Sequence, residues 1–254
     1  MEDRHKRIAS ILEQKKQVTV KYLSKELNTS AVTIRKDLKL LERNRLLFRT
    51  HGGASIESPY VHDRSVNEKE FINAQEKSAI GREAVKLLEN DQNIIIASGT
   101  TALEFARHIN PLKKLTVVTS ALNVALELVR NPSIEVLMLG GYVRPSSHSV
   151  IGQYPEQILN EIACSKLFLS VDGIDLDYGL STTNALTAHL NKKMIESAKD
   201  VIVLIDSTKF GKKSFGRICG LDQVDHIITD NKITPDIVKK IKSLGIAITI
   251  AEEL

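Results

Sequence analysis

Five short segments rich in hydroxyl groups and glycine carry side chains suited to binding a small anionic ligand. The first, Ser98-Gly99-Thr100-Thr101, follows an apolar run and opens a helical pattern. Glycine allows close approach of the backbone, and the free N–H groups at a helix start favour an anion. The other four segments contain Thr119 and Ser120, then Gly141, Arg144 and Ser149, then Asp172 and Gly173, and finally Lys209. Their hydroxyls, cations and carboxylate predict a pocket for a phosphorylated polyol.

A fold of alternating strands and helices would bring these segments together. Runs rich in Ile, Val and Leu predict buried parallel strands at residues 94–97, 115–119, 134–139, 166–171, 201–205, 226–229 and 247–250. Helical patterns fall at residues 70–90, 101–109, 121–130, 156–162, 185–198 and 235–244. This alternation predicts a doubly wound α/β sheet, in which ligands bind at the carboxyl ends of the strands. Any one loop alone is more simply a helix cap, so the prediction depends on all five sharing one edge.

A second group of candidate residues lies on a helix near the start of the chain. Its apolar positions Ile34, Leu38 and Leu41 repeat as one buried face, and Ser30 can cap its start next to Thr33. The opposite face and its flank carry Val32, Arg35, Lys36, Lys39 and Arg43. A basic outer face suits the DNA major groove, which admits one helix between rows of phosphates. The alternative is an ordinary solvated basic face.

The segments on both sides of this helix favour DNA binding. Helical patterns at residues 4–14 and 20–27 come before it, with a turn at 28–29, which is the arrangement of a helix-turn-helix. After it, residues 46–51 alternate as in a strand, and a glycine pair can close a tight turn. We interpret this stretch as a β-wing in which Arg49 and His51 reach a phosphate or the minor groove. A linker strand with incidental charges is the alternative.

The charge distribution separates this head from the rest of the chain. Residues 1–50 contain 13 Lys/Arg and 6 Asp/Glu, a net charge of +7, whereas the whole chain of 254 residues carries only +4. A basic head on a mildly acidic body indicates that the head alone binds a polyanion. We therefore predict a DNA-binding domain at residues 1–56, a polar linker at 57–69 and an α/β effector-binding domain at 70–254.

The remaining composition predicts neither a metal site nor a membrane segment. Cys164 and Cys219 are far apart, and the histidines are scattered without the spacing of metal ligands. No apolar run approaches the roughly 20 residues that a membrane-spanning helix needs. We accordingly expect a cytoplasmic protein with no metal and no cofactor.

The stretch from residue 18 to residue 54 resembles the N-terminal signature of DeoR-family transcriptional regulators. In that family a second helix with the pattern L-x-x-x-L is followed by S-x-x-T-I-R-x-D-L and then by R-x-x-G-G-A. The matching positions are Ser30, Thr33, Ile34, Arg35, Asp37, Leu38, Arg49, Gly52, Gly53 and Ala54. The resemblance implies a winged helix-turn-helix that binds double-stranded operator DNA through residues 30–43.

Later motifs resemble the effector domain of the same family, in its usual order: SGTT, VVTS, LGG-x-x-R, VDGID, GLSTTN and DSTKFG. That domain is similar to the ribose-phosphate isomerase and glucosamine-phosphate deaminase folds. By the resemblance, residues 98–101 would hold a phosphate, while Asp172 and Lys209 would face the sugar. Ala97 stands where some relatives carry a carboxylate. The expected fold is a small winged helix-turn-helix domain followed by a larger doubly wound parallel-sheet domain.

These features predict a repressor of a sugar-metabolism operon that a phosphorylated sugar releases from its operator. One recognition helix reads too few base pairs to select a genomic site, so we expect a homodimer or homotetramer. The alternative is an isomerase-like enzyme that carries a DNA-binding head, which would need a positioned base. The isomerases place a glutamate before a lysine on a helix that aligns with residues 190–194, LNKKM, where a lysine takes its place. Asp172, Asp175 and Asp177 remain as possible bases, and we predict no catalytic residue.

Overall fold

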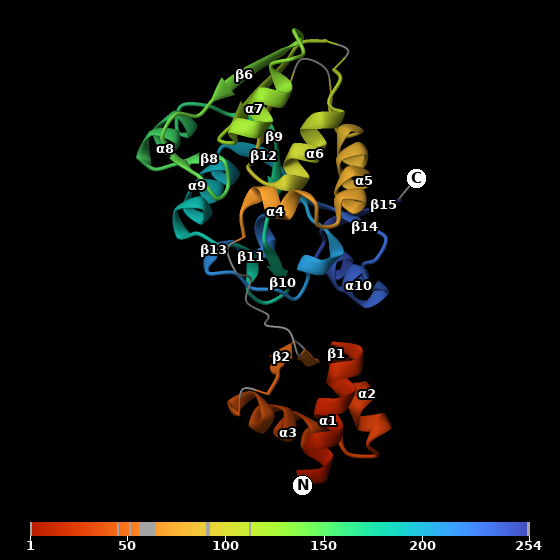
Figure 1. Ribbon diagram of the computed structural model, residues 1–254. Coiled ribbons are helices and arrows are strands. Elements are labelled where there is room, and N and C mark those ends of the chain that lie inside the picture. Colours follow the sequence, from red (N-terminus) through yellow and green to blue (C-terminus); the bar gives the residue numbers. More distant parts are fainter. Residues whose placement is uncertain are drawn as a thin grey trace. The chain divides into compact units, whose positions relative to one another are not determined.

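The computed structural model describes residues 2–44, 46–50, 52–55, 64–89, 92–111 and 113–252 (Figure 1). The chain divides into two compact units, residues 1–61 and 62–254. The proposed wing residue His51 lies outside the described residues. None of the helices in the described ranges is long and apolar enough to cross a membrane.

The first unit is a three-helix head with a small antiparallel sheet. Its elements are α1 Glu2–Lys15, β1 Gln17–Thr19, α2 Val20–Glu26, α3 Ala31–Arg43, β2 Phe48–Thr50 and β3 Gly53–Ser55. The strand order is β1-β3-β2, so the predicted wing is a true hairpin of β2 and β3 rather than a linker strand. Its turn includes Gly52 at φ 96°, a conformation that glycine adopts without strain. Residues from all three helices fill the core, including Ile8, Leu23 and Ile34, each fully buried.

A partly buried ion pair ties α1 to α3. Arg4 donates from Nε to Asp37 Oδ2 at 2.6 Å, and His5 Nε2 lies 3.1 Å from Asp37 Oδ1. Burial alone would raise the pKa of Asp37, but the hydrogen bonds from Arg4 and His5 outweigh it and hold that pKa below its usual value. The carboxylate therefore stabilises the folded head in its ionised form.

We expect Asp37→Asn to lower the free energy of unfolding of the head by about 1–3 kcal/mol at pH 7, because the variant breaks a partly buried pair. A depressed folded-state pKa contributes stability that is complete above the unfolded value of about 3.9 and is lost as the pH falls through the folded value. Thermal unfolding as a function of pH checks this, and Glu42→Gln is the control, since its pair with Arg49 is exposed. Equal stability of both variants at pH 7 would contradict the role of Asp37.

The second unit is built on a parallel sheet with helices on both faces. Within the described residues, seven strands lie in the order β15-β14-β12-β9-β4-β5-β6, and all neighbours are parallel. They are β4 Asn93–Ile96, β5 Leu115–Thr119, β6 Ile134–Met138, β9 Cys164–Ser170, β12 Ala198–Leu204, β14 His226–Asp230 and β15 Ala247–Ala251. All seven strands predicted from apolar runs are present, and the predicted doubly wound fold is confirmed.

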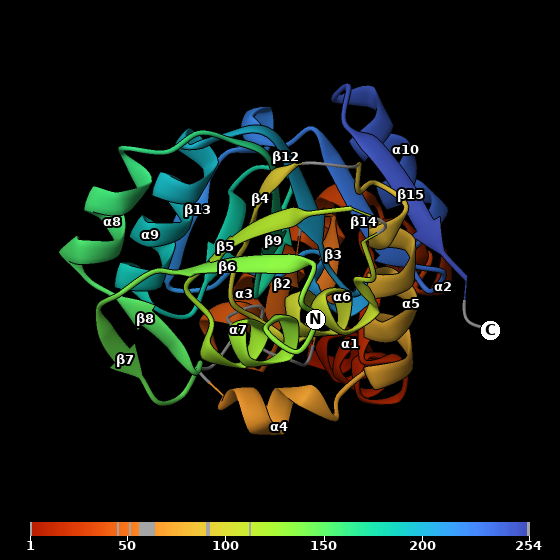
Figure 2. The same ribbon diagram turned by 90° about the horizontal axis from the view of Figure 1, so that it is seen from above.

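Two hydrophobic cores lie on opposite faces of this sheet. Within β4, Ile95 packs into one core, whereas Ile94 and Ile96 pack into the other, as the alternation of strand side chains requires. One face is covered by α5 Ala74–Val85, α6 Thr100–His108 and α7 Leu122–Leu128; the other is covered by α8 Gln153–Leu159, α9 Ala185–Glu196 and α10 Pro235–Ser243 (Figure 2). Apolar burial on both faces explains why the strands read as continuous apolar runs.

Three parts of the second unit differ from the sequence-based expectation. The predicted helix 70–90 is instead a short helix α4 Val66–Glu70, three turn residues and α5, because Asn73 takes a left-handed conformation at φ 53°. The hairpin of β7 Tyr142–Arg144 and β8 Ser149–Ile151 was not predicted. Nor was the small sheet of β10 Gly173–Asp175, β11 Gly179–Thr182 and β13 Gly216–Cys219. These strands are three or four residues long, too short to show a periodicity.

Candidate functional site

The basic helix α3 presents the predicted residues on one exposed face. Ser30 caps its start, since its Oγ accepts a hydrogen bond from the Thr33 N–H at 3.2 Å and lies 2.9 Å from the Thr33 hydroxyl. Val32 is 61% exposed, and the four cations Arg35, Lys36, Lys39 and Arg43 are all exposed. The opposite face is buried in the head, as predicted. The exposed face therefore combines a polar first turn with a row of cations.

A groove beside the start of α3 adds two cations that the sequence analysis missed. It has a volume of about 490 Å³ and is lined by Thr19, Val20, Lys21, Ser24, Lys25, Ala31, Arg35 and Gly52. Lys21 and Lys25 stand four residues apart on α2, so they lie on one face of that helix. This spacing was visible in the sequence. Together with Arg35, they line a cationic groove between α2, α3 and the turn of the wing.

Arg49 is held by α3 rather than extended from the wing. Its backbone N–H and its Nε donate to the two carboxylate oxygens of Glu42, at 2.9 and 2.8 Å. This pair joins β2 to the last turn of α3. In this arrangement Arg49 links the wing to α3.

The second candidate site lies at the carboxyl ends of the central strands. The sheet order reverses between β4 and β9, because β4 leads to β5 on one side and β9 leads to β12 on the other. Gly99 follows β4 at φ 136°, and a Cβ built on it would lie 2.6 Å from Cβ of Ser170 at the end of β9. Ser170 Oγ is buried and has no hydrogen-bond partner among the described residues. Crevices at such reversals are the usual ligand sites of open α/β sheets.

Ser98, Thr100 and Thr101 lie at the start of α6, which follows β4 at this reversal of the sheet. Gly99 is the N-cap of α6, and its carbonyl accepts a backbone hydrogen bond from Leu103 at 2.9 Å. The following N–H groups belong to the first turn, where no helical partner is available. Thr100 and Thr101 are both buried. The first turn of α6, whose N–H groups favour an anion, therefore begins beside the end of β9.

Asp172 lies between the end of β9 and the start of β10, and both of its oxygens are engaged. Oδ1 accepts from Lys69 Nζ at 2.8 Å, while Oδ2 accepts from the Thr182 hydroxyl at 2.8 Å and the Thr183 N–H at 3.2 Å. Burial favours a higher pKa for Asp172, but Lys69, the Thr182 hydroxyl and the charge of Lys209 together hold it below its usual value. The group is an anion and a hydrogen-bond acceptor.

Three other predicted effector-site residues, Thr119, Gly141 and Gly173, have contacts inside the domain. The Thr119 hydroxyl donates to Ile96 O at 2.7 Å and accepts from the Ala121 N–H at 3.1 Å, so it is engaged inside the sheet. Gly141 and Gly173 are needed for backbone packing, because a built Cβ would approach Ile151 O to 2.8 Å and Lys212 O to 2.6 Å respectively.

The β7–β8 hairpin carries Arg144 opposite Ser149 and is joined to the carboxyl end of β5, where Val150 N donates to Ser120 O at 2.8 Å. The hairpin therefore brings Arg144 and Ser149 to the carboxyl edge of the sheet, near Ser120.

Three further polar residues of the edge were not predicted, because the sequence analysis assigned their segment to a linker or a plain helix. Lys69 contacts Asp172, and the Asn73 side chain donates to Asp206 Oδ1 at 3.1 Å. Lys77 donates to the carbonyls of Lys69 and Ile72, each at 2.5 Å, and burial lowers its pKa to about 8. The sequence offered one signal for Lys77, which is a lysine at a position of the predicted helix that should be buried.

Comparison with known proteins decides the family. The model described as "DeoR-like helix-turn-helix domain" matches residues 4–59, and that described as "DeoR C terminal sensor domain" matches residues 72–231. The chain belongs to the DeoR family. Its helix-turn-helix and sensor domains imply DNA and a small-molecule effector as the partners of a DeoR-family regulator.

Relatives in this family match nearly the whole chain. The HTH-type transcriptional regulator GolR of Listeria innocua is 34% identical over 250 residues, which cover 98% of each protein. A putative aga operon transcriptional repressor of Escherichia coli O157:H7 is 36% identical over 254 residues, or 99% of this chain and 94% of that one. The lactose phosphotransferase system repressor of Staphylococcus epidermidis is 31% identical over 244 residues, or 94% and 95%.

Among solved structures, a ribose 5-phosphate isomerase A of Methanocaldococcus jannaschii is similar over 53% of each chain, with a TM-score of 0.38 and 17% identity. The fold assignment of this DeoR-family chain stands on its strand order, independently of that likeness.

The enzyme alternative is not supported for this DeoR-family chain. The relatives named above are transcriptional regulators and not enzymes. Asp175 accepts from the N–H groups of Asp177 and Tyr178, which makes it part of the β10–β11 turn. Lys193 pairs with Glu196 one helical turn away. Among the described residues, no group of three or more His, Cys, Asp or Glu side chains is placed to hold a metal ion.

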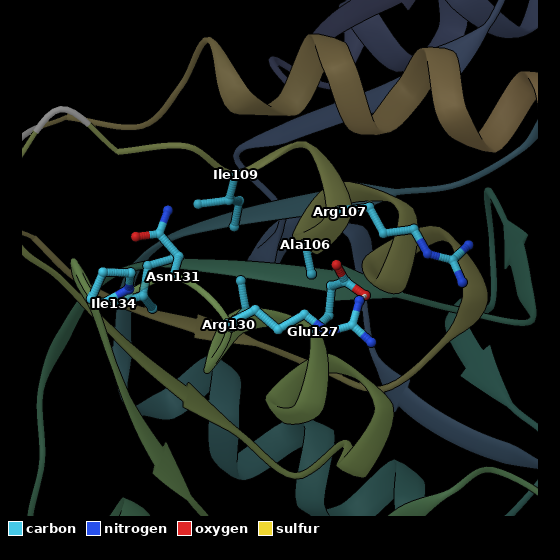
Figure 3. A pocket seen from close by; sticks show the side chains of 9 residues that line it. Ala106, Arg107, Ile109, Glu127, Arg130, Asn131 and Ile134 are labelled. Atoms are coloured by element: carbon cyan, nitrogen blue, oxygen red, sulfur yellow. Dashed lines mark hydrogen bonds and ion pairs between the residues drawn. The ribbon is translucent and has the colours of Figure 1, made fainter.

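A separate cavity of about 350 Å³ lies away from this edge (Figure 3). It is lined by Arg107 near the end of α6, by Leu128 at the end of α7 and Arg130 just after it, and by Ile134 at the first position of β6. Because β6 is parallel to its neighbours, Ile134 marks the amino end of the sheet. The helix ends around this cavity present carbonyl groups, which disfavour anions.

Proposed function

We propose that this DeoR-family regulator represses a sugar-metabolism operon and that a phosphorylated sugar releases it from its operator. The observation that carries the proposal is the exposed basic face of α3, on a head whose charge contrasts with the rest of the chain. The names of the relatives, among them a lactose phosphotransferase system repressor, support the sugar-linked role. A repressor acts where the chromosome lies, so we place its action in the cytoplasm.

In the proposed complex α3 occupies the major groove of double-stranded operator DNA. Its first turn, with Ser30, Val32 and Thr33, would contact base edges, and its cations would contact bases and phosphates. These cations are Arg35, Lys36, Lys39 and Arg43, joined by Lys21 and Lys25 of the groove. Arg49 would set the wing position through Glu42, and His51 at the turn would lie close to the backbone of the duplex. A homodimer or homotetramer would supply the second head that a genomic site requires.

In the proposed effector site the crevice at the sheet reversal holds the sugar phosphate. The start of α6, with Ser98, Thr100 and Thr101, would bind the phosphate, and Lys209, whose charge acts on Asp172, would face the sugar. Asp172 would accept from a sugar hydroxyl, and Ser120, Arg144 and Ser149 would close the pocket from the β7–β8 hairpin. We assign Thr119, Gly141 and Gly173 to the framework of the pocket, because their groups are used in packing.

A thermal-shift screen against sugar phosphates tests the effector proposal. A ligand at about 100 times its Kd adds roughly 2.7 kcal/mol to the free energy of unfolding, which raises the Tm of a domain this size by several degrees. Glucosamine 6-phosphate and ribose 5-phosphate are the first probes. The Thr100→Ala and Lys209→Ala proteins should lose this shift while binding operator with the affinity of the unmodified protein. If either variant shifted normally, the pocket would be misplaced.

A further inference from the structure

The short helix α4 stands between the head and the effector site in the sequence and is fastened to that site by side chains. Its start is fixed by a backbone bond from Val66 N to Ser146 O at 2.7 Å, and the Val66 side chain is buried. On its far side, Glu70 accepts from Arg107 at 2.6 Å. These two contacts attach α4 to the β7–β8 turn and to α6.

Two further attachments end on residues of the sheet edge. Lys69 donates to Asp172 at 2.8 Å, with only 22% and 15% of the two side chains exposed, and Asn73 donates to Asp206 at 3.1 Å. Lys77 binds the last carbonyls of this turn, because its Nζ donates to Lys69 O and Ile72 O. The position of α4 therefore depends on the carboxylate that we assign to the sugar.

We propose that the Lys69–Asp172 ion pair is a latch that the effector opens. The ammonium of Lys69 donates to Asp172 Oδ1, while the Thr182 hydroxyl and the Thr183 N–H donate to Oδ2. A sugar hydroxyl that binds Asp172 must share or displace the ammonium. Displacing it removes one of the contacts that hold α4, the first helix after the ten residues, 56–65, that join it to the last strand of the head. This inference rests on the proposed function and assigns Lys69 as a positioning residue.

The latch predicts that one substitution changes the affinities for effector and for operator DNA in opposite directions. The effector and Lys69 compete for one carboxylate, and effector and operator binding are reciprocally linked. Lys69→Gln should therefore bind the sugar phosphate more tightly and operator DNA more weakly than the unmodified protein. A direct contact of Lys69 with the effector would instead weaken effector binding. A purely structural role would lower the Tm without the opposed changes.

The experiment measures both affinities of the full chain, with the operator by fluorescence anisotropy and with the sugar phosphate that gives a thermal shift in the screen. We expect Lys69→Gln to weaken operator binding and to strengthen effector binding, each by about tenfold. Lys69→Arg should restore both values, because it preserves the charge-assisted bond. Lys86→Gln is the matched control, since it removes a lysine from an exposed helical pair with Glu83. Far-UV circular dichroism of each variant verifies folding.

Several results would overturn the latch. If Lys69→Gln matched the unmodified protein in both affinities, or weakened effector binding, the latch would be wrong while the proposed function stood. If the unmodified protein bound operator but responded to no sugar phosphate, the proposed function would fail, and the latch with it. Faster amide hydrogen exchange across residues 66–70 in Lys69→Gln than in Lys86→Gln would support the latch independently, and equal exchange would count against it.

Discussion

The protein with both Arg35→Ala and Lys36→Ala should bind operator DNA about 30- to 1,000-fold more weakly than the unmodified protein. The two side chains are exposed near the start of α3, where a recognition helix contacts bases and phosphates. Losing a base contact costs about 1–3 kcal/mol, and losing a phosphate contact also reduces the dependence of log K on log salt concentration by about one unit. Fluorescence anisotropy over a range of salt concentrations measures both effects.

The control for this variant removes the same charge from the sensor domain. Lys239 and Lys240 are exposed on α10, so the double alanine variant there has the same net charge but an unchanged head. Its operator affinity and salt dependence should equal those of the unmodified protein. Equal weakening of both double variants would mean that net charge, and not α3, governs DNA binding.

Gly99→Ala should abolish the response to the effector and lower the free energy of unfolding of the sensor domain by roughly 1–3 kcal/mol. The φ of 136° is unfavourable for any residue with a Cβ, and that Cβ would lie 2.6 Å from Cβ of Ser170. The start of α6 must shift to relieve this contact, and the shift moves the proposed phosphate-binding groups. The measurements are thermal unfolding and operator release by the sugar phosphate.

Two further variants isolate the cause. Gly140 lies on the same sheet edge, and no heavy atom of the described residues, its chain neighbours aside, approaches a Cβ built on it within 4 Å. The Gly140→Ala variant should therefore respond normally to the effector. Adding Ser170→Gly to Gly99→Ala removes the clash but not the backbone strain, so the response should return in part. A Gly99→Ala protein that released operator normally would contradict the placement of the phosphate at this helix start.

Long, regular elements were predictable from the sequence because their periodicity reflects burial directly. The buried stripe of α3 and the apolar run of β4 each follow from the need to hide one or two faces from water. That the loops after the strands share one edge of the sheet was also predictable, because parallel strands end at the same edge. Ser30 was recognised as a cap because its hydroxyl has one obvious use at a helix start.

Residues that act through contacts distant in sequence were not predictable. In the sequence Lys69 is simply a lysine in a polar stretch. Only the fold brings it into contact with Asp172, which lies 103 positions later in the chain. The sequence did not show that Arg49 bonds to Glu42, and its contact with DNA stays a prediction. Nor did it show that the Thr119 hydroxyl bonds to Ile96 O and to the Ala121 N–H, and its contact with the effector stays a prediction. In each case the fold supplies the partner, which the residue type alone does not reveal.

The most direct test of the central claim is an anisotropy titration of a labelled operator duplex, obtained by selection from genomic fragments, with the full chain at fixed salt concentration. The account predicts tight binding that weakens at least tenfold when a sugar phosphate that raises the Tm is added. An operator affinity unchanged by every sugar phosphate that binds the protein would contradict the account.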